Sequence, residues 1–229
     1  RHERAPYLRE PLRLLSPESD IQEVRCQFPA QTGKSTIAEI VILYYMTIVP
    51  SEILFVSSDE RAAGKFMTRR IEPRAKAAGI EFRAESSSLS RRTGDRAYSK
   101  EFSGGNLDTA SALSVSQLAS ETKRIIIADE VDRYRLTLGD DGLTWDQITA
   151  RGQAWSTEKK VLAISTPTTA VGSIISQLHN EGDQRQYYVP CPYCGFMQLL
   201  DFSSDKGAGL AWDYKNGRIY KRSLRFICS

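Results

Sequence analysis

One short stretch, residues 28–36, limits what this chain can fold into more than any other. It reads Phe-Pro-Ala-Gln-Thr-Gly-Lys-Ser-Thr, follows an extended run at 23–26 and leads into an apolar run at helical spacing over 37–46. A strand, a short loop ending in Gly-Lys-Ser and a helix make up a phosphate-binding P-loop. In such a unit, backbone N–H groups and the positive end of the helix converge on phosphate oxygens. The stretch therefore predicts a nucleotide-binding strand–loop–helix unit.

The residue types in this loop have defined chemical roles. Gly33 lets the backbone approach the phosphates, Lys34 reaches the β- and γ-phosphates, and the Ser35 hydroxyl ligates Mg²⁺. The residues expected to bind the nucleotide here are Gln31, Thr32, Gly33, Lys34, Ser35 and Thr36. The full pattern has glycine five residues before Gly33, where this chain has Phe28. Taken alone, the motif leaves an ordinary capped helix start as the alternative.

A second pattern lies at residues 125–130, where an apolar run ends in the paired carboxylates of Asp129 and Glu130. This is the Walker B arrangement. We expect Asp129 to hold Mg²⁺ through water and Glu130 to polarise the attacking water as general base. The alternative is a central strand that ends in solvated acids, and the upstream Gly-Lys-Ser makes it the weaker interpretation.

A third apolar run, 160–164, ends in Ser165-Thr166-Pro167-Thr168. In helicase-like ATPases a polar group at this place, beside the P-loop strand, senses the γ-phosphate, and Thr166 is our candidate. A plain strand terminus is the alternative. Expected strands at 23–26, 52–57, 125–129 and 160–165 alternate with helical segments, expected over 37–46, 60–79 and 145–158, and each motif follows a strand. This order predicts a RecA-like P-loop NTPase: an α/β fold with a mainly parallel central sheet flanked by helices and the site along one edge.

Composition restricts the remaining possibilities. The 229 residues are 41% hydrophobic and 26% charged, as in ordinary globular proteins, and the net charge of +3 is too small to establish a nucleic-acid partner. No apolar run approaches the roughly 20 residues of a membrane span. Residues 1–13 are charged and contain two prolines, so we expect no signal peptide, no membrane partner and a cytoplasmic location with reduced cysteines.

Three of the four cysteines lie late in the chain. Cys191 and Cys194 are three apart and followed by Gly195, which permits a tight turn, and Cys228 is a third candidate ligand. Zinc needs four ligands, so these three cysteines make an incomplete knuckle. We expect the fourth ligand to be a residue after Ser229 or a group from another molecule. Two free thiols in a turn are the alternative. Cys26, before the P-loop, is better explained as a core residue.

Several motifs together resemble the large terminase subunit of tailed bacteriophages, the GpA-like group. The matching stretches are 6–11 (Pro-Tyr-Leu-Arg-Glu-Pro), 30–35 (Ala-Gln-Thr-Gly-Lys-Ser), 128–134 (Ala-Asp-Glu-Val-Asp-Arg-Tyr), 165–168 (Ser-Thr-Pro-Thr) and 189–195 (Val-Pro-Cys-Pro-Tyr-Cys-Gly). They span nearly the whole chain. The combination of Asp-Glu-Val-Asp-Arg, Ser-Thr-Pro-Thr and the cysteine knuckle is specific, whereas no single motif would be.

The resemblance implies an ATPase motor that uses ATP and Mg²⁺ to translocate double-stranded DNA into a procapsid in the host cytoplasm. It also implies a homo-oligomeric ring at the portal protein, recruited with a small terminase subunit. We expect a motor domain with an N-terminal leader over 1–185, and a zinc-knuckle segment, Zn²⁺ included, over 186–229. The nuclease domain of the family should lie beyond residue 229 and be absent from this chain.

Many terminases carry an arginine shortly before the Walker B strand that reaches a neighbouring subunit's nucleotide. By spacing, Ala119 occupies this place here, which leaves Arg124 or Arg151 as catalytic substitutes. Arg91 and Arg92, in a loop-like segment, are the alternative, and surface arginines facing solvent or DNA are the plain interpretation. Two other functions stay open: a helicase-type DNA-dependent ATPase, and a nucleic-acid-binding zinc module on a catalytically silent P-loop scaffold.

Overall fold

The computed structural model describes residues 5–83, 99–114, 122–137, 142–169, 171–200 and 209–228. The chain divides into two compact units, Arg1–Asp183 and Gln184–Ser229. Each unit has sheets of its own, and the first holds all the expected nucleotide-site residues. Among the described residues, no helix has both the length and the apolar character needed to cross a membrane.

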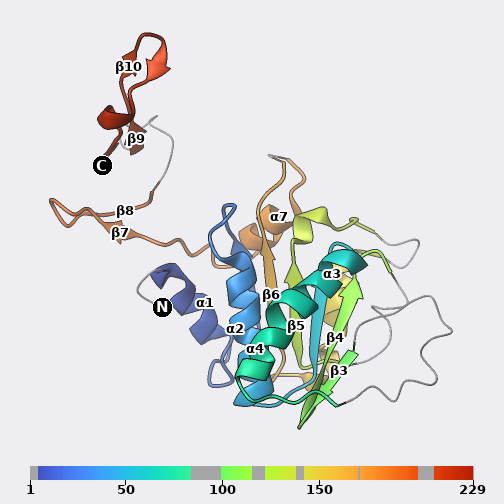
Figure 1. Ribbon diagram of the computed structural model, residues 1–229. Coiled ribbons are helices and arrows are strands. Elements are labelled where there is room, and N and C mark those ends of the chain that lie inside the picture. The colour runs from blue at the N-terminus through green and yellow to red at the C-terminus, as the bar shows by residue number, and fades with distance from the viewer. Residues whose placement is uncertain are drawn as a thin grey trace. The chain divides into compact units, whose positions relative to one another are not determined.

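A single sheet organises the first unit (Figure 1). Within the described residues its strands are β1 Glu23–Gln27, β2 Ile53–Ser57, β3 Ser99–Phe102, β4 Gly105–Ser111, β5 Ile125–Asp129 and β6 Lys160–Ser165. Their order is β1-β6-β5-β2-β4-β3, and every neighbouring pair is parallel except the β3–β4 hairpin. The carboxyl ends of the five parallel strands therefore meet at one edge, which confirms the expected mainly parallel α/β fold.

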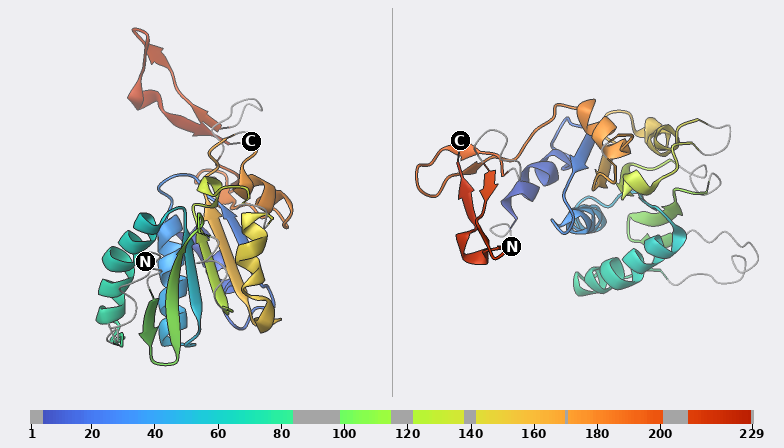
Figure 2. Two further views of the ribbon diagram at one scale, coloured as in Figure 1. Left: turned by 90° about the vertical axis from the view of Figure 1, so that its right-hand side faces the viewer. Right: turned by 90° about the horizontal axis from the view of Figure 1, so that it is seen from above.

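Helices cover both faces of this sheet (Figure 2), with α2, α3 and α4 on one face and α6 and α7 on the other. The described helical segments are η2 Pro6–Leu8, α1 Arg9–Leu14, α2 Lys34–Thr47, α3 Glu60–Phe66, η3 Met67–Ile71, α4 Glu72–Ala77, η4 Val131–Arg133, α6 Thr144–Ala150, η5 Gln153–Trp155 and α7 Ile174–Asn180. The result is a three-layer arrangement, as expected when strands alternate with helices.

The core has two parts because alternate strand residues face opposite sides of the sheet. On β5, Ile125 and Ile127 join the cluster under α2, whereas Ile126 and Ala128 join the cluster under α6 and α7. All four are fully buried. Since each fully buried large apolar side chain contributes about 1.5–3 kcal/mol, this continuous apolar run anchors the strand that ends in Asp129.

Two expected helices are shorter than the sequence pattern suggested. The helix expected over 60–79 consists of α3, the π-helical segment η3 and α4. Pro73 lies in the first turn of α4 and has no N–H to continue the α-helical ladder, which accounts for the change of helix type before it. The helix expected over 145–158 ends at Ala150, two residues before Gly152, and continues only as the short η5.

The residues before β1 pack against the first unit. Leu8 and Leu15 are buried, and Leu15 belongs to the core cluster under α2. The Tyr45 hydroxyl donates a hydrogen bond of 2.8 Å to the Leu15 carbonyl. The leader is therefore part of the fold rather than a solvated arm.

The second unit is built from short hairpins. Its described strands are β7 Val189–Pro190, β8 Met197–Gln198, β9 Gly209–Ala211, β10 Tyr214–Lys215, β11 Arg218–Ile219 and β12 Arg225–Ile227, with η6 Lys221–Ser223 between the last two. They pair antiparallel as β7–β8, β10–β11 and β9–β12. The first pair brackets the Cys191–Cys194 turn, and the last pair ends immediately before Cys228.

Candidate nucleotide-binding site

The loop between β1 and α2 leaves a helix N-terminus open. Gln31 and Gly33 have positive φ values of 61° and 90°, and Gly33 precedes α2 without a side-chain cap. A side chain at Gly33 would be strained at this φ and would meet the Leu8 side chain at 3.5 Å. The first N–H groups of a helix have no partner within it. This loop therefore offers a backbone cradle of the kind that binds phosphate oxygens.

The unusual Phe28 has a packing role in this loop. Its side chain packs against the core cluster under α2, and the Tyr7 ring meets it edge-on at 6.2 Å between centroids. The Tyr7 hydroxyl donates to the Thr32 carbonyl at 2.8 Å, and the Phe28 N–H donates to the Ser165 carbonyl at 3.0 Å. The leader and the end of β6 therefore fix a loop whose sequence lacks the first glycine of the pattern.

Three side chains, one from the start of α2 and two from neighbouring strand ends, meet beside this cradle. Lys34, the first residue of α2, donates a hydrogen bond from Nζ to the Thr166 hydroxyl at the end of β6. The same Nζ lies 3.8 Å from Oε1 of Glu130, which follows β5. Because β6 lies between β1 and β5, the sheet order brings them together. The Lys34 side chain is 10% exposed, so these contacts form in a mostly desolvated place.

Asp129 is the more deeply buried of the two acids at the end of β5, Asp129 and Glu130. Its Oδ1 has no hydrogen-bond partner, and burial raises the pKa of its carboxyl to about 6, with the charge of Glu130 adding to the rise and that of Lys34 opposing it. A buried oxygen without a partner is costly unless a cation or a donor occupies the space before it. The oxygen donors here, the Asp129 carboxylate and the Ser35 hydroxyl at the start of α2, fit Mg²⁺, a hard cation that prefers oxygen ligands.

Glu130 has an unusual backbone conformation. Its φ is 61°, in the left-handed region, where a non-glycine residue is strained. Its N–H donates to the Ile164 carbonyl at 2.8 Å, and Arg133 Nε lies 3.1 Å from its Oε2. The side chain is 32% exposed. The turn thus points one carboxylate out of the strand end, between Lys34 and Arg133.

Two residues that follow Glu130, Asp132 and Tyr134, have contacts that sequence reasoning missed. The Tyr134 hydroxyl is fully buried and donates to the carbonyls of Val56 at 2.9 Å and Asp129 at 3.0 Å. Burial raises the pKa of Tyr134 far above its usual value. Although burial also raises the pKa of Asp132, hydrogen bonds from Ile175, Thr168 and Ser173 outweigh this effect, and the net pKa of the carboxyl is lowered. The only available signal was their presence in the Asp-Glu-Val-Asp-Arg-Tyr stretch.

The two candidate arginines lie at the opposite edge of the sheet from the P-loop of their own chain. Arg124 immediately precedes β5, where its guanidinium is 3.3 Å from Glu158 and stacks over the Trp155 ring at 5.8 Å. The Arg151 carbonyl accepts a hydrogen bond from the N–H of Lys123. The fold does not bring either one to Lys34. Arg91, Arg92 and Ala119 lie outside the described residues.

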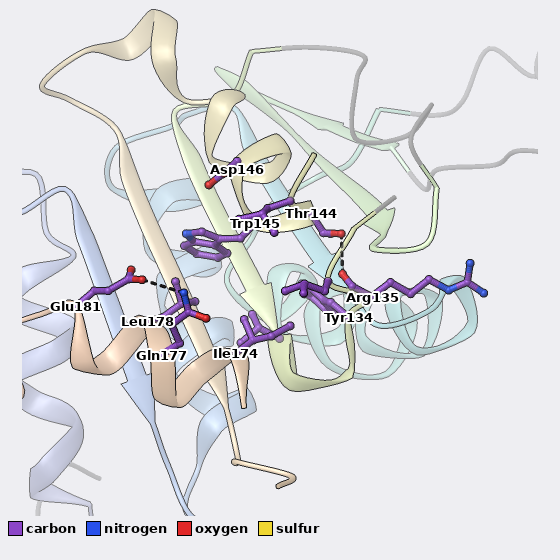
Figure 3. A pocket seen from close by; sticks show the side chains of 12 residues that line it. Tyr134, Arg135, Thr144, Trp145, Asp146, Ile174, Gln177, Leu178 and Glu181 are labelled. Carbon is purple, nitrogen blue, oxygen red and sulfur yellow. Dashed lines mark hydrogen bonds between the residues drawn. The ribbon is translucent and has the colours of Figure 1, made fainter. Parts of the chain in front are cut away.

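A pocket opens behind the strand ends, between η4, α6 and α7 (Figure 3). Its walls include Tyr134, Trp145, Ile174 and Leu178, and a hydrogen bond from Gln177 to Glu181 runs along one side. The residues of the phosphate cradle, 31–36, are absent from the described lining. The pocket is therefore separate from the cradle, although Tyr134 contacts both the pocket and the backbone of Asp129.

In the second unit, the structure brings together the three late cysteines. The sulfur atoms of Cys191, Cys194 and Cys228 all lie within 4.8 Å of one another, and those of Cys194 and Cys228 are 3.8 Å apart. The Gly195 N–H donates to the Cys191 carbonyl at 2.9 Å, and the Cys191 N–H donates to the Phe196 carbonyl at 2.8 Å. Three convergent sulfurs fit a soft metal such as Zn²⁺.

The thiols of Cys191 and Cys26 have opposite electrostatic surroundings, whereas hydrogen bonds with Cys191 and Cys194 raise the pKa of Cys228. Hydrogen bonds from the backbone of Cys194 and Tyr193 lower the pKa of the Cys191 thiol to about 7. Burial alone raises the pKa of the Cys26 thiol to about 12. A lowered pKa favours the thiolate, which is the form that ligates metals, whereas Cys26 stays a neutral core residue.

The fold is similar to those of solved terminase structures. The HK97 bacteriophage large terminase matches with a TM-score of 0.56 and 13% identity, over 77% of this chain and 36% of that one. A large terminase from a thermophilic bacteriophage matches with a TM-score of 0.52 and 14% identity, over 71% of this chain and 39% of that one. At these identities the likeness shows the fold alone. The chain thus corresponds to well under half the length of these two terminases.

No curated protein matches the chain in sequence. The family model described as "Phage terminase large subunit gpA, ATPase domain" matches residues 1–228, which is almost the whole chain. This match agrees with the parallel sheet and with the strand-end positions of the Gly-Lys-Ser, Asp-Glu and Ser-Thr-Pro-Thr motifs. The chain therefore belongs to the family of ATPase domains of the phage terminase large subunit gpA.

Proposed function

We propose that this chain is the ATP-hydrolysing motor of a viral DNA-packaging terminase and that hydrolysis drives double-stranded DNA into a procapsid. The observation that carries the proposal is the convergence of Lys34, at the uncapped N-terminus of α2, with Glu130 and Thr166 at two neighbouring strand ends. Membership of the terminase ATPase family supports it independently. DNA, the portal protein, a small terminase subunit and a homo-oligomeric ring are the partners that this role requires.

The residues of the loop would bind the triphosphate. Backbone N–H groups over 31–36 would hold its oxygens, Lys34 would neutralise charge on the β- and γ-phosphates, and Thr166 would contact the γ-phosphate. The partnerless Asp129 Oδ1 and the Ser35 hydroxyl would hold Mg²⁺. When bound, Mg²⁺ neutralises charge that develops on the phosphoryl oxygens.

Glu130 would act as the general base. Its carboxylate follows the magnesium-binding Asp129 and is one-third exposed, so a water molecule can reach it from solvent. The contact with Lys34 would hold the carboxylate beside the phosphate site. In-line attack then needs only a correctly placed water, because phosphoryl transfer depends mainly on positioning and charge stabilisation.

A cation from a neighbouring subunit would complete the site. Arg124 and Arg151 lie away from their own P-loop, which suits a role toward another copy rather than in their own site. An arginine supplied in trans is worth roughly 10³–10⁵ in rate in related NTPases. We therefore expect turnover per chain to rise with protein concentration or on assembly at a portal. A specific activity that is flat across concentration and assembly state would contradict this part of the proposal.

In the second unit, we propose that Cys191, Cys194 and Cys228 hold a structural Zn²⁺. The support is the convergence of their sulfurs and the hydrogen bonds that favour the Cys191 thiolate. A fourth ligand would come from outside these three residues. The ion would link the segments that carry these cysteines and would take no part in ATP hydrolysis.

The decisive experiment is the Glu130→Gln variant. The amide keeps the size of the side chain but cannot take a proton, so we expect kcat for ATP to fall at least 100-fold while nucleotide affinity stays within a few-fold. Lys34→Ala should instead weaken nucleotide binding itself. Glu60→Gln, an exposed glutamate on α3, is the matched control and should leave both quantities unchanged.

The outcomes separate the alternatives. If Glu130→Gln retained turnover within a few-fold of the parent, the general-base role would be wrong. If the parent hydrolysed no ATP when assembled with DNA and portal, the silent-scaffold alternative would replace the motor. Strand displacement by an active parent, in place of translocation along intact duplex, would identify a helicase-type ATPase.

A further inference from the structure

Asp132 has an unusually complete set of partners for a residue that is not in the phosphate cradle. One carboxylate oxygen, Oδ2, accepts hydrogen bonds from the Thr168 N–H at 2.7 Å and the Thr168 hydroxyl at 3.1 Å. The other, Oδ1, accepts from the Ser173 hydroxyl at 3.0 Å and the Ile175 N–H at 2.8 Å. One side chain therefore holds both the segment that follows β6 and the first turn of α7.

The main chain of Asp132 is tied to the same segment. Its N–H donates to the Ser165 hydroxyl at 3.2 Å. Ser173 in turn caps α7, because its hydroxyl accepts a hydrogen bond from the Ser176 N–H at 3.2 Å. The segment 165–168 is thus fixed on both sides of Thr166, by contacts with a residue that lies only two positions after Glu130.

Thr166 is the link between this network and the phosphate cradle. Its hydroxyl accepts the hydrogen bond from Lys34, and it lies between Ser165 and Thr168, which both bond to Asp132. A shift of segment 165–168 would therefore move Thr166 relative to Lys34 and to Glu130. Reaction rates are sensitive to such shifts, since a misplacement of about 1 Å can cost about 100-fold.

We propose that Asp132 is a positioning residue for ATP hydrolysis, which holds Thr166 and the start of α7 in register with Glu130. The inference rests on the proposed ATPase function. Asp132 touches none of the groups expected to react; it acts through Thr166 and through the turn that carries Glu130. It therefore sets the geometry of the hydrolytic step more than the affinity for the nucleotide.

The test is Asp132→Asn. An amide has one acceptor oxygen, so its NH₂ group must face either the Thr168 donors or the Ser173 and Ile175 donors, and one half of the network is lost. We expect kcat to fall at least tenfold, with ATP affinity within about threefold of the parent. Amide exchange at Thr168 or Ile175 should accelerate at least tenfold, whereas the amides of β2 and β5 keep their protection. Asp146→Asn, on the exposed face of α6, is the matched control.

A second, milder pair of variants tests the same network if Asp132→Asn fails to fold. Thr168→Val removes only the hydroxyl donor and should lower kcat about threefold. The Thr169 hydroxyl bonds to the Val171 carbonyl instead, so Thr169→Val should leave kcat unchanged.

Equal effects of the two variants on kcat would overturn the inference, and so would a folded Asp132→Asn variant with parental kcat. If the parent itself hydrolysed no ATP, alone or assembled, the proposed function would fail and the inference with it. A fully active parent beside an unaffected Asp132→Asn variant would overturn the inference alone.

Discussion

The two units of the chain are ordered by different forces. The first unit buries large apolar side chains on both faces of its sheet, among them Phe55, Ile126 and Leu162, each with no exposed surface. In the described part of the second unit, only Cys191, Gln198 and Gly209 are buried. Most of its large apolar residues are exposed, including Tyr193 at 98%, and Leu210, Trp212 and Phe226 are only half-buried. Burial of apolar side chains can therefore account for the stability of the first unit but not for that of the second.

The size of the second unit explains this difference. Chains this short bury too little surface on folding to offset the loss of conformational entropy, and they commonly depend on metals or disulfides. All four cysteines are free, so no disulfide contributes. What joins the first hairpin of the unit to its last strand is the cluster of Cys191, Cys194 and Cys228. The Zn²⁺ that we propose for these cysteines would also supply the missing stabilisation.

The largest expected effect is on the second unit when zinc is removed. Structural Zn²⁺ contributes an apparent binding free energy of about 10–16 kcal/mol near neutral pH. Chelation, or Cys191→Ser, should therefore abolish exchange protection in β7, β8, β9 and β12. The first unit should keep its thermal midpoint. Hydrogen exchange with mass spectrometry and elemental analysis for zinc measure the two quantities on the same sample.

A matched cysteine variant controls this experiment. Cys26→Ala removes a thiol from β1, far in sequence from the cluster, and should leave the zinc content unchanged. Replacement of zinc by Co²⁺ should give the intense near-ultraviolet absorption of thiolate ligation, and this band should weaken in Cys191→Ser. Unchanged exchange protection in the metal-free chain would show that the second unit does not depend on a metal.

The second effect concerns the core of the first unit. Phe55 is fully buried on β2, and its ring stacks on that of Phe66 at 4.2 Å between centroids. Phe55→Ala should lower the free energy of unfolding of this unit by about 3–5 kcal/mol, through lost transfer energy and the cavity left behind. Tyr193→Ala, the contrasting aromatic deletion in the exposed second unit, should change stability by less than about 0.5 kcal/mol. Urea unfolding monitored by far-ultraviolet circular dichroism measures both.

Local patterns were enough to predict much of the first unit. The expected strands at 52–57 and 125–129 have apolar cores, 53–56 and 125–128, without polar alternation, because both faces of the strands are covered. The structure confirms them as β2 and β5. The Gly-Lys-Ser loop, the Asp-Glu pair and Ser-Thr-Pro-Thr were likewise expected at strand ends, where they are found. Each of these features is encoded by residues that are adjacent in the sequence.

The rest depends on contacts between distant residues, which a single sequence does not display. Asp132 bonds to residues 33 to 43 positions away, and Tyr134 bonds to Val56 across 78 positions. Glu39 reads as a polar interruption of the apolar run in α2, yet it is buried and paired with Arg70 and Arg74. Pairings of this kind become visible only once the sheet order is known.

The smallest expected effect compares two arginine clusters, one in each unit. Arg25 in β1 is 23% exposed and donates to Glu23 at 2.8 Å, Glu181 at 3.0 Å and the Leu178 carbonyl at 3.1 Å. Arg225 in β12 is 52% exposed, its one paired carboxylate, that of Asp213, is 3.3 Å away, and it donates to the Ser223 carbonyl at 3.1 Å. Exposed pairs contribute about 0–1 kcal/mol because water and salt screen them, whereas a less exposed network with two carboxylate partners contributes more.

We therefore expect Arg25→Gln to lower the free energy of unfolding of the first unit by about 1–2 kcal/mol. Arg225→Gln should change the protection of the zinc-loaded second unit by less than about 0.5 kcal/mol. Because the Arg25 network is less exposed to solvent, its effect should also respond less to salt between about 0.05 and 0.5 M, concentrations that span Debye lengths of about 14 to 4 Å. Hydrogen exchange measured per unit gives both free energies. If Arg225→Gln lowered the free energy of unfolding as much as Arg25→Gln does, surface ion pairs would contribute substantially to the stability of the second unit. A dependence of that unit mainly on the proposed metal would then be wrong.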